Sequence, residues 1–194
     1  MLQLAPKTDE GWARITDTEQ KILRAAAQVL ESGGTLTTRA VCEAAGVKSP
    51  TLYHYFGDKD GLSAALVRQG MAEFMARKRK VHSDDPMLQL REGWEQSVDF
   101  ALERPALYGL YLDQLRTQPE LSQDAYLLMH SRVQRLVDRG VFKGTVEEAA
   151  RAVWAGCNGV LSLIGKGWSK REVKVTSQSL FEAVVGRLSQ ADPS

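Results

Sequence analysis

The sequence has few cysteines and no long hydrophobic run. Only Cys42 and Cys157 occur among the 194 residues, so a disulfide framework is excluded and a reducing, cytoplasmic setting is expected. No stretch approaches the roughly 18 apolar residues that a membrane-spanning helix needs. The N-terminus also lacks the basic start and apolar stretch of a signal peptide. These features predict a cytoplasmic protein with no membrane partner.

Charge of one sign is not in excess either. The formal net charge is +1 at pH 7, so composition alone does not indicate that the protein binds nucleic acid. Hydrophobic residues make up 43% and charged residues 25% of the chain, which is ordinary for a folded globular protein. The length fits one small domain joined to one of roughly 120–140 residues.

Strand patterns are nearly absent, and almost every segment has the spacing of an amphipathic helix. The sequence therefore predicts an all-α fold. We expect a disordered arm over 1–15, a helix-turn-helix domain over 16–62 and a larger helical domain over 63–194. Caps, prolines and glycines set the limits of the expected helices, which are about 16–32, 37–46, 49–56, 59–80, 85–103, 105–116, 119–139, 145–166 and 177–190.

Two short predicted helices meet at a turn, Gly46-Val47-Lys48, and follow a supporting helix. This arrangement is a helix-turn-helix, whose second helix enters the major groove of DNA. Leu52 and Phe56 supply the inward face of that helix. The residues left to face outward are polar or aromatic: Ser49, Pro50, Thr51, Tyr53, His54 and Tyr55.

Two basic residues flank this helix. Arg39 has the planar donor fork that suits guanine. Lys59 begins the next helix, whose N-terminal amides can bind a phosphate. The pattern predicts double-stranded operator DNA as a partner.

The segment from Leu36 to Lys59 resembles the DNA-binding region of the TetR/AcrR family of repressors. The resemblance is carried by Ala-Gly-Val before the turn, Thr-Leu-Tyr-x-x-Phe in the second helix and the following Asp-Lys-x-Gly-Leu. It covers roughly residues 16–70, and it implies a cytoplasmic homodimer that represses transcription and leaves DNA when a small ligand binds. The family's DNA-contacting positions correspond here to Thr38, Arg39, Ser49, Pro50, Thr51, Tyr53, His54 and Lys59.

The C-terminal helices carry no diagnostic motif. The resemblance implies that the last two long helices pair with those of a second copy, whereas the alternative is that they only pack on each other. Small residues on helix 145–166 would allow close approach of another helix: Ala149, Ala152, Gly156 and Gly159.

A pocket for a small-molecule effector would be lined by inward-facing residues of the middle helices, since such pockets are mostly apolar. Arg91 and Arg132 are further polar candidates. Each lining candidate could instead be a core residue: Trp94, Val98, Tyr108, Tyr111, Met129, Trp154 and Asn158.

Two other features are given structural interpretations. The basic run Arg77-Lys78-Arg79-Lys80 is expected to be a solvated helix end that suits the negative end of the helix dipole. Cys157 lies on an apolar helix, where a lone thiol is usually inert. A redox-sensing role is the alternative for this cysteine.

The competing class of function is an all-α enzyme or ligand carrier that does not bind DNA. His54, His82 and His130 share no metal-ligand spacing with each other or with the cysteines. No Gly-rich phosphate loop or nucleophile motif occurs either. We therefore predict no catalytic residues, no metal and no cofactor. Within the leading class, the sequence does not separate a ligand-released repressor from an activator or a ligand-independent regulator.

Overall fold

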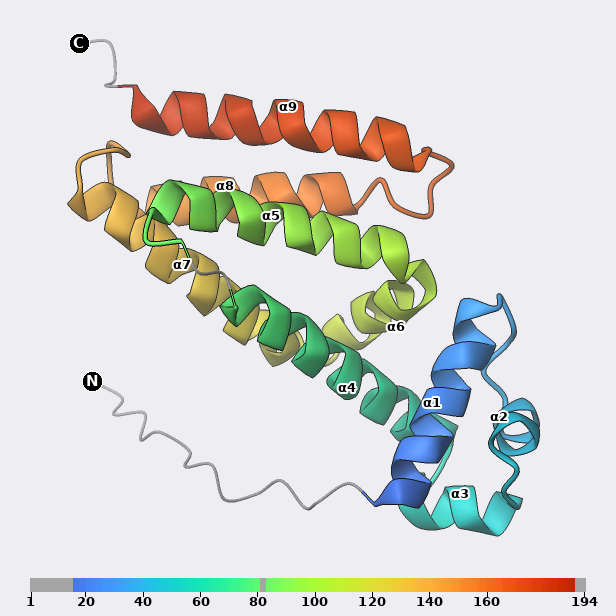
Figure 1. The fold of residues 1–194 in the computed structure, drawn as a ribbon. Coiled ribbons are helices and arrows are strands. Elements are labelled where there is room, and N and C mark those ends of the chain that lie inside the picture. Colours follow the sequence, from blue (N-terminus) through green and yellow to red (C-terminus); the bar gives the residue numbers. More distant parts are fainter. Residues whose placement is uncertain (1–15, 81–82, 191–194) are drawn as a thin grey trace. The chain divides into compact units, whose positions relative to one another are not determined.

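The computed structural model describes residues 16–80 and 83–190. Within them the regular structure is nine α-helices and one short 3₁₀ helix, with no strand (Figure 1). This confirms the all-α prediction. None of these helices is both long and apolar enough to cross a membrane. The arm predicted over 1–15 lies outside the described residues.

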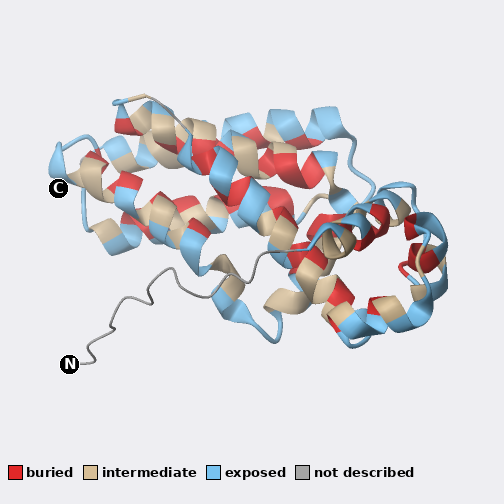
Figure 2. Ribbon diagram, turned by 60° about the horizontal axis from the view of Figure 1, so that its bottom comes forward, coloured by how far each residue is buried: buried red, intermediate tan, exposed pale blue. Residues whose placement is uncertain are grey.

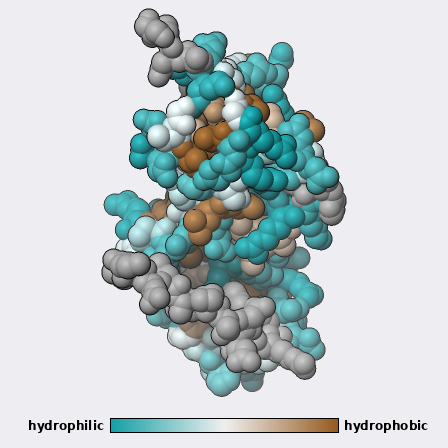
Figure 3. Space-filling view, turned by 90° about the vertical axis from the view of Figure 1, so that its left-hand side faces the viewer, coloured by the Kyte–Doolittle hydropathy of each residue, from teal (hydrophilic) through white to brown (hydrophobic). Residues whose placement is uncertain are grey.

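Contacts divide the chain into two compact units, Met1–Leu66 and Val67–Ser194. In both, the buried residues lie on the sides of the helices that face their neighbours (Figure 2). On the face shown in Figure 3, hydrophobic residues gather in small patches between hydrophilic ones. The sequence-based limit at residue 62 stays a prediction.

The first unit is a small helical bundle. It contains α1 (Asp17–Glu31), α2 (Thr38–Ala45), α3 (Ser49–Phe56) and the start of α4 (Lys59–Arg79). Thr37 caps α2, because its hydroxyl accepts a hydrogen bond from the backbone N–H of Ala40 at 3.2 Å. Apolar side chains from all four helices form the core: Ile22, Leu23, Ala26, Val41, Ala45, Leu52, Phe56 and Leu62.

The turn between α2 and α3 depends on a glycine. Gly46 ends α2 with φ of 60° in the left-handed region, which glycine adopts without the steric penalty of a Cβ. Lys48 occupies the N-cap position of α3 without a capping side-chain hydrogen bond, and a proline lies in the first turn of that helix. At the other end of α3, the Asp58 carboxylate accepts a hydrogen bond from the N–H of Gly61 at 2.7 Å and starts α4. The glycine turn and the proline fix where α3 begins, and the Asp58 cap fixes where α4 takes over.

The second unit contains the rest of α4 and five further α-helices. They are α5 (Pro86–Glu103), α6 (Pro105–Leu115), α7 (Gln123–Asp138), α8 (Val146–Leu161) and α9 (Lys170–Ser189), with the 3₁₀ helix η1 (Pro119–Ser122) before α7. Helix α5 contacts α6, α7, α8 and α9, while α8 packs between α7 and α9. The core therefore lies around α5 and α8.

Three predicted helix limits were wrong. Helix α9 begins at Lys170 rather than 177, because Ser169 and Glu172 form a capping box that the prediction overlooked. Helix α8 ends at Leu161 rather than 166 and is followed by turns. The segment predicted as one helix over 119–139 starts as the 3₁₀ helix η1, and its α-helical part begins only at Gln123.

Two buried polar side chains tie the helices of this unit together. The indole N–H of Trp94 on α5 donates to the hydroxyl of Ser177 on α9 at 2.8 Å. The guanidinium of Arg132 on α7 donates to the carbonyl oxygens of Gln89 and Lys78, at 2.8 and 3.0 Å. Buried donors need such partners, because an unpaired one is costly.

Replacing Ser177 with alanine should destabilise the second unit. The change leaves the buried indole N–H of Trp94 without its acceptor, which costs about 1–3 kcal/mol. Urea unfolding followed by circular dichroism measures the loss of unfolding free energy. The control is Ser131→Ala, because Ser131 is exposed on α7 and bonds only to its own helix. Equal stability of the two variants would contradict the prediction.

Candidate functional site

Helix α3 presents one apolar and one polar face. Leu52 and Phe56 are buried in the first unit. Ser49, Pro50 and His54 are exposed, and Thr51 is half-buried. Tyr53 is 48% exposed, although its ring is large and apolar. Because burial of Leu52 and Phe56 fixes the rotation of the helix, the other side chains form an outward surface.

The predicted residues outside α3 also lie in the first unit. Arg39 is exposed and Thr38 half-buried in the first turn of α2, and Lys59 is exposed at the start of α4. The Sγ of Cys42 lies 4.0 Å from the Oγ of Ser49, which places α2 against the N-terminus of α3. Neither Arg39 nor Lys59 forms a hydrogen bond or ion pair within the described part of the chain. Their charged groups are therefore available to a partner.

This surface offers donors of the kind that bind nucleic acid. Hydroxyls from Ser49, Thr51 and Tyr53 can donate to phosphate oxygens, which sets register. The guanidinium of Arg39 can make two parallel hydrogen bonds to a guanine edge. Sequence reasoning left out Lys48, the exposed residue at the N-cap position of α3. Its position beside the turn is the signal that could have found it.

A second candidate site is a cavity of about 160 Å³ inside the second unit. Helices α4, α5, α6, α7 and α8 contribute its walls, which are mostly apolar and aromatic. Four of the predicted ligand-contacting residues line it: Tyr108, Tyr111, Trp154 and Asn158. The amide of Asn158 donates to the carbonyl oxygen of Trp154 at 2.8 Å, so it is partly engaged within its own helix.

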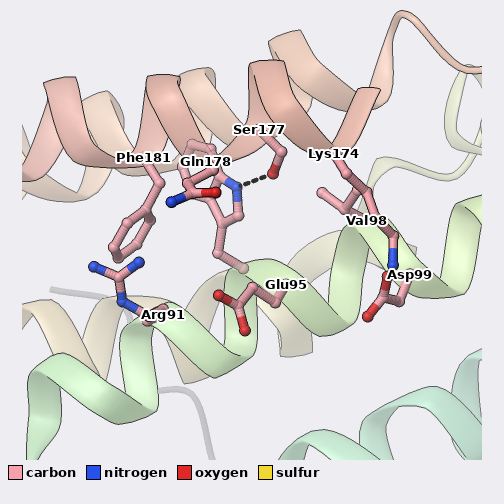
Figure 4. A pocket seen from close by; sticks show the side chains of 9 residues that line it. Arg91, Glu95, Val98, Asp99, Lys174, Ser177, Gln178 and Phe181 are labelled. Atoms are coloured by element: carbon pink, nitrogen blue, oxygen red, sulfur yellow. Dashed lines mark hydrogen bonds and ion pairs between the residues drawn. The ribbon is translucent and has the colours of Figure 1, made fainter. Parts of the chain in front are cut away.

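The other three predicted residues lie elsewhere. Met129 and Trp94 line an adjacent space of about 30 Å³, which has room for little more than a water molecule. Val98 and Trp94 line a groove of about 350 Å³ between α5 and α9 (Figure 4). The structure thus separates this set into three places.

The groove between α5 and α9 has charged walls, and three of its charged groups have partners within the protein. Lys174 and Asp99 form an ion pair at 2.8 Å. The guanidinium of Arg91 lies 4.7 Å from the centre of the Phe181 ring, a cation–π geometry. The dashed line to the Ser177 hydroxyl in Figure 4 is the hydrogen bond that this hydroxyl accepts from the indole N–H of Trp94. The exposed Glu95 carboxylate also lines the groove and has no hydrogen bond or ion pair within the described residues, so the groove offers one acidic group to a ligand.

Lys78 lines the 160 Å³ cavity, although the sequence analysis predicted that it lies on a solvated helix end. It is 6% exposed, and its Nζ lies 4.8 Å from the centre of the Phe74 ring. That interpretation was wrong for Lys78, because a residue four positions after Phe74 shares its buried face. Arg77 and Arg79, on other faces, form exposed ion pairs with Glu103 and Asp124.

Burial changes the acidity of the groups around the cavity. Burial lowers the pKa of Lys78 to about 8, mainly by desolvation; Cys157 acts against this shift and the nearby Arg132 adds to it. Burial raises the pKa of Tyr111 to about 12 and the pKa of Tyr108 as well. Burial also raises the pKa of Cys157 to about 11, so its thiol is protonated at neutral pH. Protonated buried thiols react slowly.

No metal centre is indicated by the geometry. Within residues 16–80 and 83–190, no group of three or more histidine, cysteine, aspartate or glutamate side chains is arranged to hold a metal ion.

Comparison with known proteins yields matches in both units. Residues 22–66 match the bacterial regulatory proteins of the tetR family, and residues 90–188 match the tetracyclin repressor-like C-terminal domain. The HTH-type transcriptional regulator BetI of Stenotrophomonas maltophilia is 39% identical over 77 residues. That match covers 37% of this chain and 39% of the relative, well under half of its length.

Solved structures share the fold across nearly the whole chain. A TetR transcription regulator from Haloarcula marismortui is 19% identical, with a TM-score of 0.74 over 90% of this chain and 99% of its own. The ketosteroid transcriptional regulator KstR2 of Mycobacterium tuberculosis is 20% identical, with a TM-score of 0.65 over 89% of this chain and 95% of its own. At such identities the likeness concerns the fold alone.

Replacing Lys78 with methionine should stabilise the protein at neutral pH. The folded-state pKa of about 8 lies below the ordinary lysine pKa of 10.5, so the unfolded chain binds more protons between these two values. The wild type therefore gains unfolding free energy as pH rises from about 8 to about 10.5, up to roughly 3 kcal/mol. Lys78→Met should lack this gain and be more stable than the wild type at pH 7.

Urea unfolding at a series of pH values from 7 to 10 measures this difference. Lys80→Met removes the same charge from an exposed position and serves as the control. A difference between wild type and Lys78→Met that stays constant with pH would contradict the prediction.

Proposed function

Because the chain belongs to the TetR family of transcription regulators, whose members bind DNA and are not enzymes, we propose that it binds operator DNA as a homodimer and that a small molecule releases it. The observation that carries the proposal is the outward surface of α3. An eight-residue helix buries Leu52 and Phe56 and leaves its hydroxyl, imidazole and phenol groups exposed. Leu52 and Phe56 account for the inward face of the helix, whereas its exposed groups are not part of the core of the unit.

In the proposed complex, α3 lies in the major groove. Tyr53, Thr51 and Ser49 bind phosphates or base edges, and Arg39 reads a guanine. Lys59 and the backbone amides at the start of α4 bind a phosphate. Two copies related by twofold symmetry would place their α3 helices in successive major grooves, about 34–36 Å apart.

The proposed dimer forms through α8 and α9. Both helices carry small exposed residues, which we call the small-residue face: Ala155, Gly159, Ser179, Ala183 and the half-buried Gly186. A Cβ added at Gly159 or Gly186 would meet no atom within 4 Å. Small residues let a second pair of helices approach closely. The two helices also pack on each other within one chain, and this packing is compatible with a dimer.

The proposed effector binds in the 160 Å³ cavity of the second unit. A ligand can lower operator affinity only by the factor by which it prefers the conformer that does not bind operator. The cavity has the aromatic walls and few polar groups expected of a small-molecule site.

Replacing Tyr53 with alanine should lower operator affinity by at least tenfold, because the change removes a ring and a hydroxyl from the centre of the α3 surface. Arg39→Ala should lower it by roughly 5- to 150-fold, because it removes one bidentate contact of about 1–3 kcal/mol. Anisotropy titration of a duplex that the wild-type protein selects from a random pool measures both. Arg24→Ala removes an exposed arginine from α1 and is the matched control for Arg39→Ala.

The selected duplex should be palindromic, and binding should weaken steeply as salt rises. Failure of the wild-type protein to enrich any duplex would count against the proposal. Affinity that is unaffected by Tyr53→Ala and Arg39→Ala would also contradict it.

Replacing Ala183 with arginine should weaken the dimer by at least tenfold, because a long charged side chain would enter the small-residue face. Ala183 is exposed in the protomer, so the helical content should not change. Sedimentation equilibrium measures the dimer dissociation constant. Ser131→Arg places the same side chain at an exposed position on α7 and should leave the dimer intact. A wild-type protein that sediments as a monomer would refute the proposed assembly.

A further inference from the structure

The cavity that would hold the effector has an uneven set of polar groups. Its walls are apolar and aromatic, and they include Met71, Phe74, Phe100 and Leu161. The polar atoms that interrupt them come from the Lys78 amine, the tyrosine and serine hydroxyls, the Cys157 thiol and the Asn158 amide. No aspartate or glutamate lines this cavity or the adjacent 30 Å³ space that Lys78 also lines.

Lys78 has no acidic partner within the described part of the chain. It forms no ion pair there, and the guanidinium of Arg132, which donates to the carbonyl oxygen of Lys78, places a second cation nearby. Its Nζ lies 4.8 Å from the centre of the Phe74 ring. A buried ammonium without a counter-ion is strongly disfavoured. The site therefore favours the arrival of a negative charge.

The tyrosines of the cavity offer further donors. Tyr108 and Tyr111 lie 5.9 Å apart between ring centres, and neither hydroxyl makes a hydrogen bond within the described residues. Both are buried, and the raised pKa of each keeps it protonated at neutral pH. A protonated phenol donates one hydrogen bond. An anion in the cavity would thus find one cation and two neutral donors.

We propose that the effector is a carboxylic acid with an apolar or aromatic body, and that the amine of Lys78 pairs with its carboxylate. The inference rests on the proposed function, since it names the chemical class that the effector cavity takes. The volume of about 160 Å³ is close to that of an apolar cavity of roughly 150 Å³ that binds benzene. The effector is therefore a small acid with a body about the size of one aromatic ring or a short alkyl chain.

Matched acids and amides test this inference on DNA-free protein. The probes are phenylacetate, 3-phenylpropanoate and octanoate, each paired with its neutral primary amide of nearly equal shape. Titration calorimetry and tryptophan fluorescence, to which Trp154 in the cavity wall contributes, follow binding. At least one acid should bind at least tenfold more tightly than its amide. This comparison uses the wild-type protein and needs no variant.

Two variants test whether Lys78 causes the preference for an acid over its amide. Lys78→Met should remove most of the difference between acid and amide while leaving amide affinity little changed. Lys80→Met removes the same charge from an exposed position two residues away and should keep the preference. Equal binding of acid and amide by the wild type would overturn the inference. A preference that survives in Lys78→Met, or no binding by any of the three acids, would overturn it too.

Operator release is measured separately, so the two proposals can fail independently. If an acid binds through Lys78 but leaves operator affinity unchanged, the carboxylate site stands and ligand release is wrong. If the protein binds operator and is released only by neutral or cationic compounds, ligand release stands and the carboxylate site is wrong.

Discussion

The bonds made by the Arg132 guanidinium hold together the helices that enclose the cavity. From α7, Arg132 donates to a carbonyl near the end of α4 and to another near the start of α5. A Cβ at Gly93 would collide with the Arg132 guanidinium, so the glycine on α5 makes room for it. By fixing the last turn of α4, these bonds also fix the place of Lys78. The hydrogen bonds of the Arg132 guanidinium therefore help to place Lys78, the cation that lines the cavity.

The first unit depends on a simpler constraint. Helix α3 is short, and only Leu52 and Phe56 tie it to the core. Its orientation is secured at both ends, by the left-handed Gly46 before it and by the Asp58 cap on α4 after it. Each device is local in sequence. A surface that must match a fixed groove benefits from such rigid support, because misplacement of a contact weakens recognition.

Features formed by residues close together in the sequence, such as helix caps and glycine turns, could be predicted from the sequence. The helix-turn-helix was predictable because a capping threonine, two glycines and an apolar pair at four-residue spacing all lie within about twenty residues. The capping box of Ser169 and Glu172 had the same kind of signal, and overlooking it shortened the predicted α9. The cavity was different. Tyr108 and Tyr111 lie on α6 and Trp154 on α8, and only tertiary packing decides that these three line the 160 Å³ cavity while Trp94 and Met129 do not. Lys78 was missed because a run of four basic residues was treated as one surface, although a helix turns each of them to a different side.

The buried lysine links stability to recognition in the second unit. Its lowered pKa means that the empty cavity stabilises the neutral amine relative to the charged one, so at neutral pH the charged form is held at a cost in folding free energy. A ligand that supplies a carboxylate removes part of that cost, whereas its amide does not. Affinity would then come from relief of an unfavourable state as well as from new contacts. A cavity with a neutral lining would have to obtain the same discrimination from hydrogen bonds alone. Within the described residues, the Lys78 ammonium lowers the stability of the second unit, and the same group would make the cavity select a carboxylate over its amide.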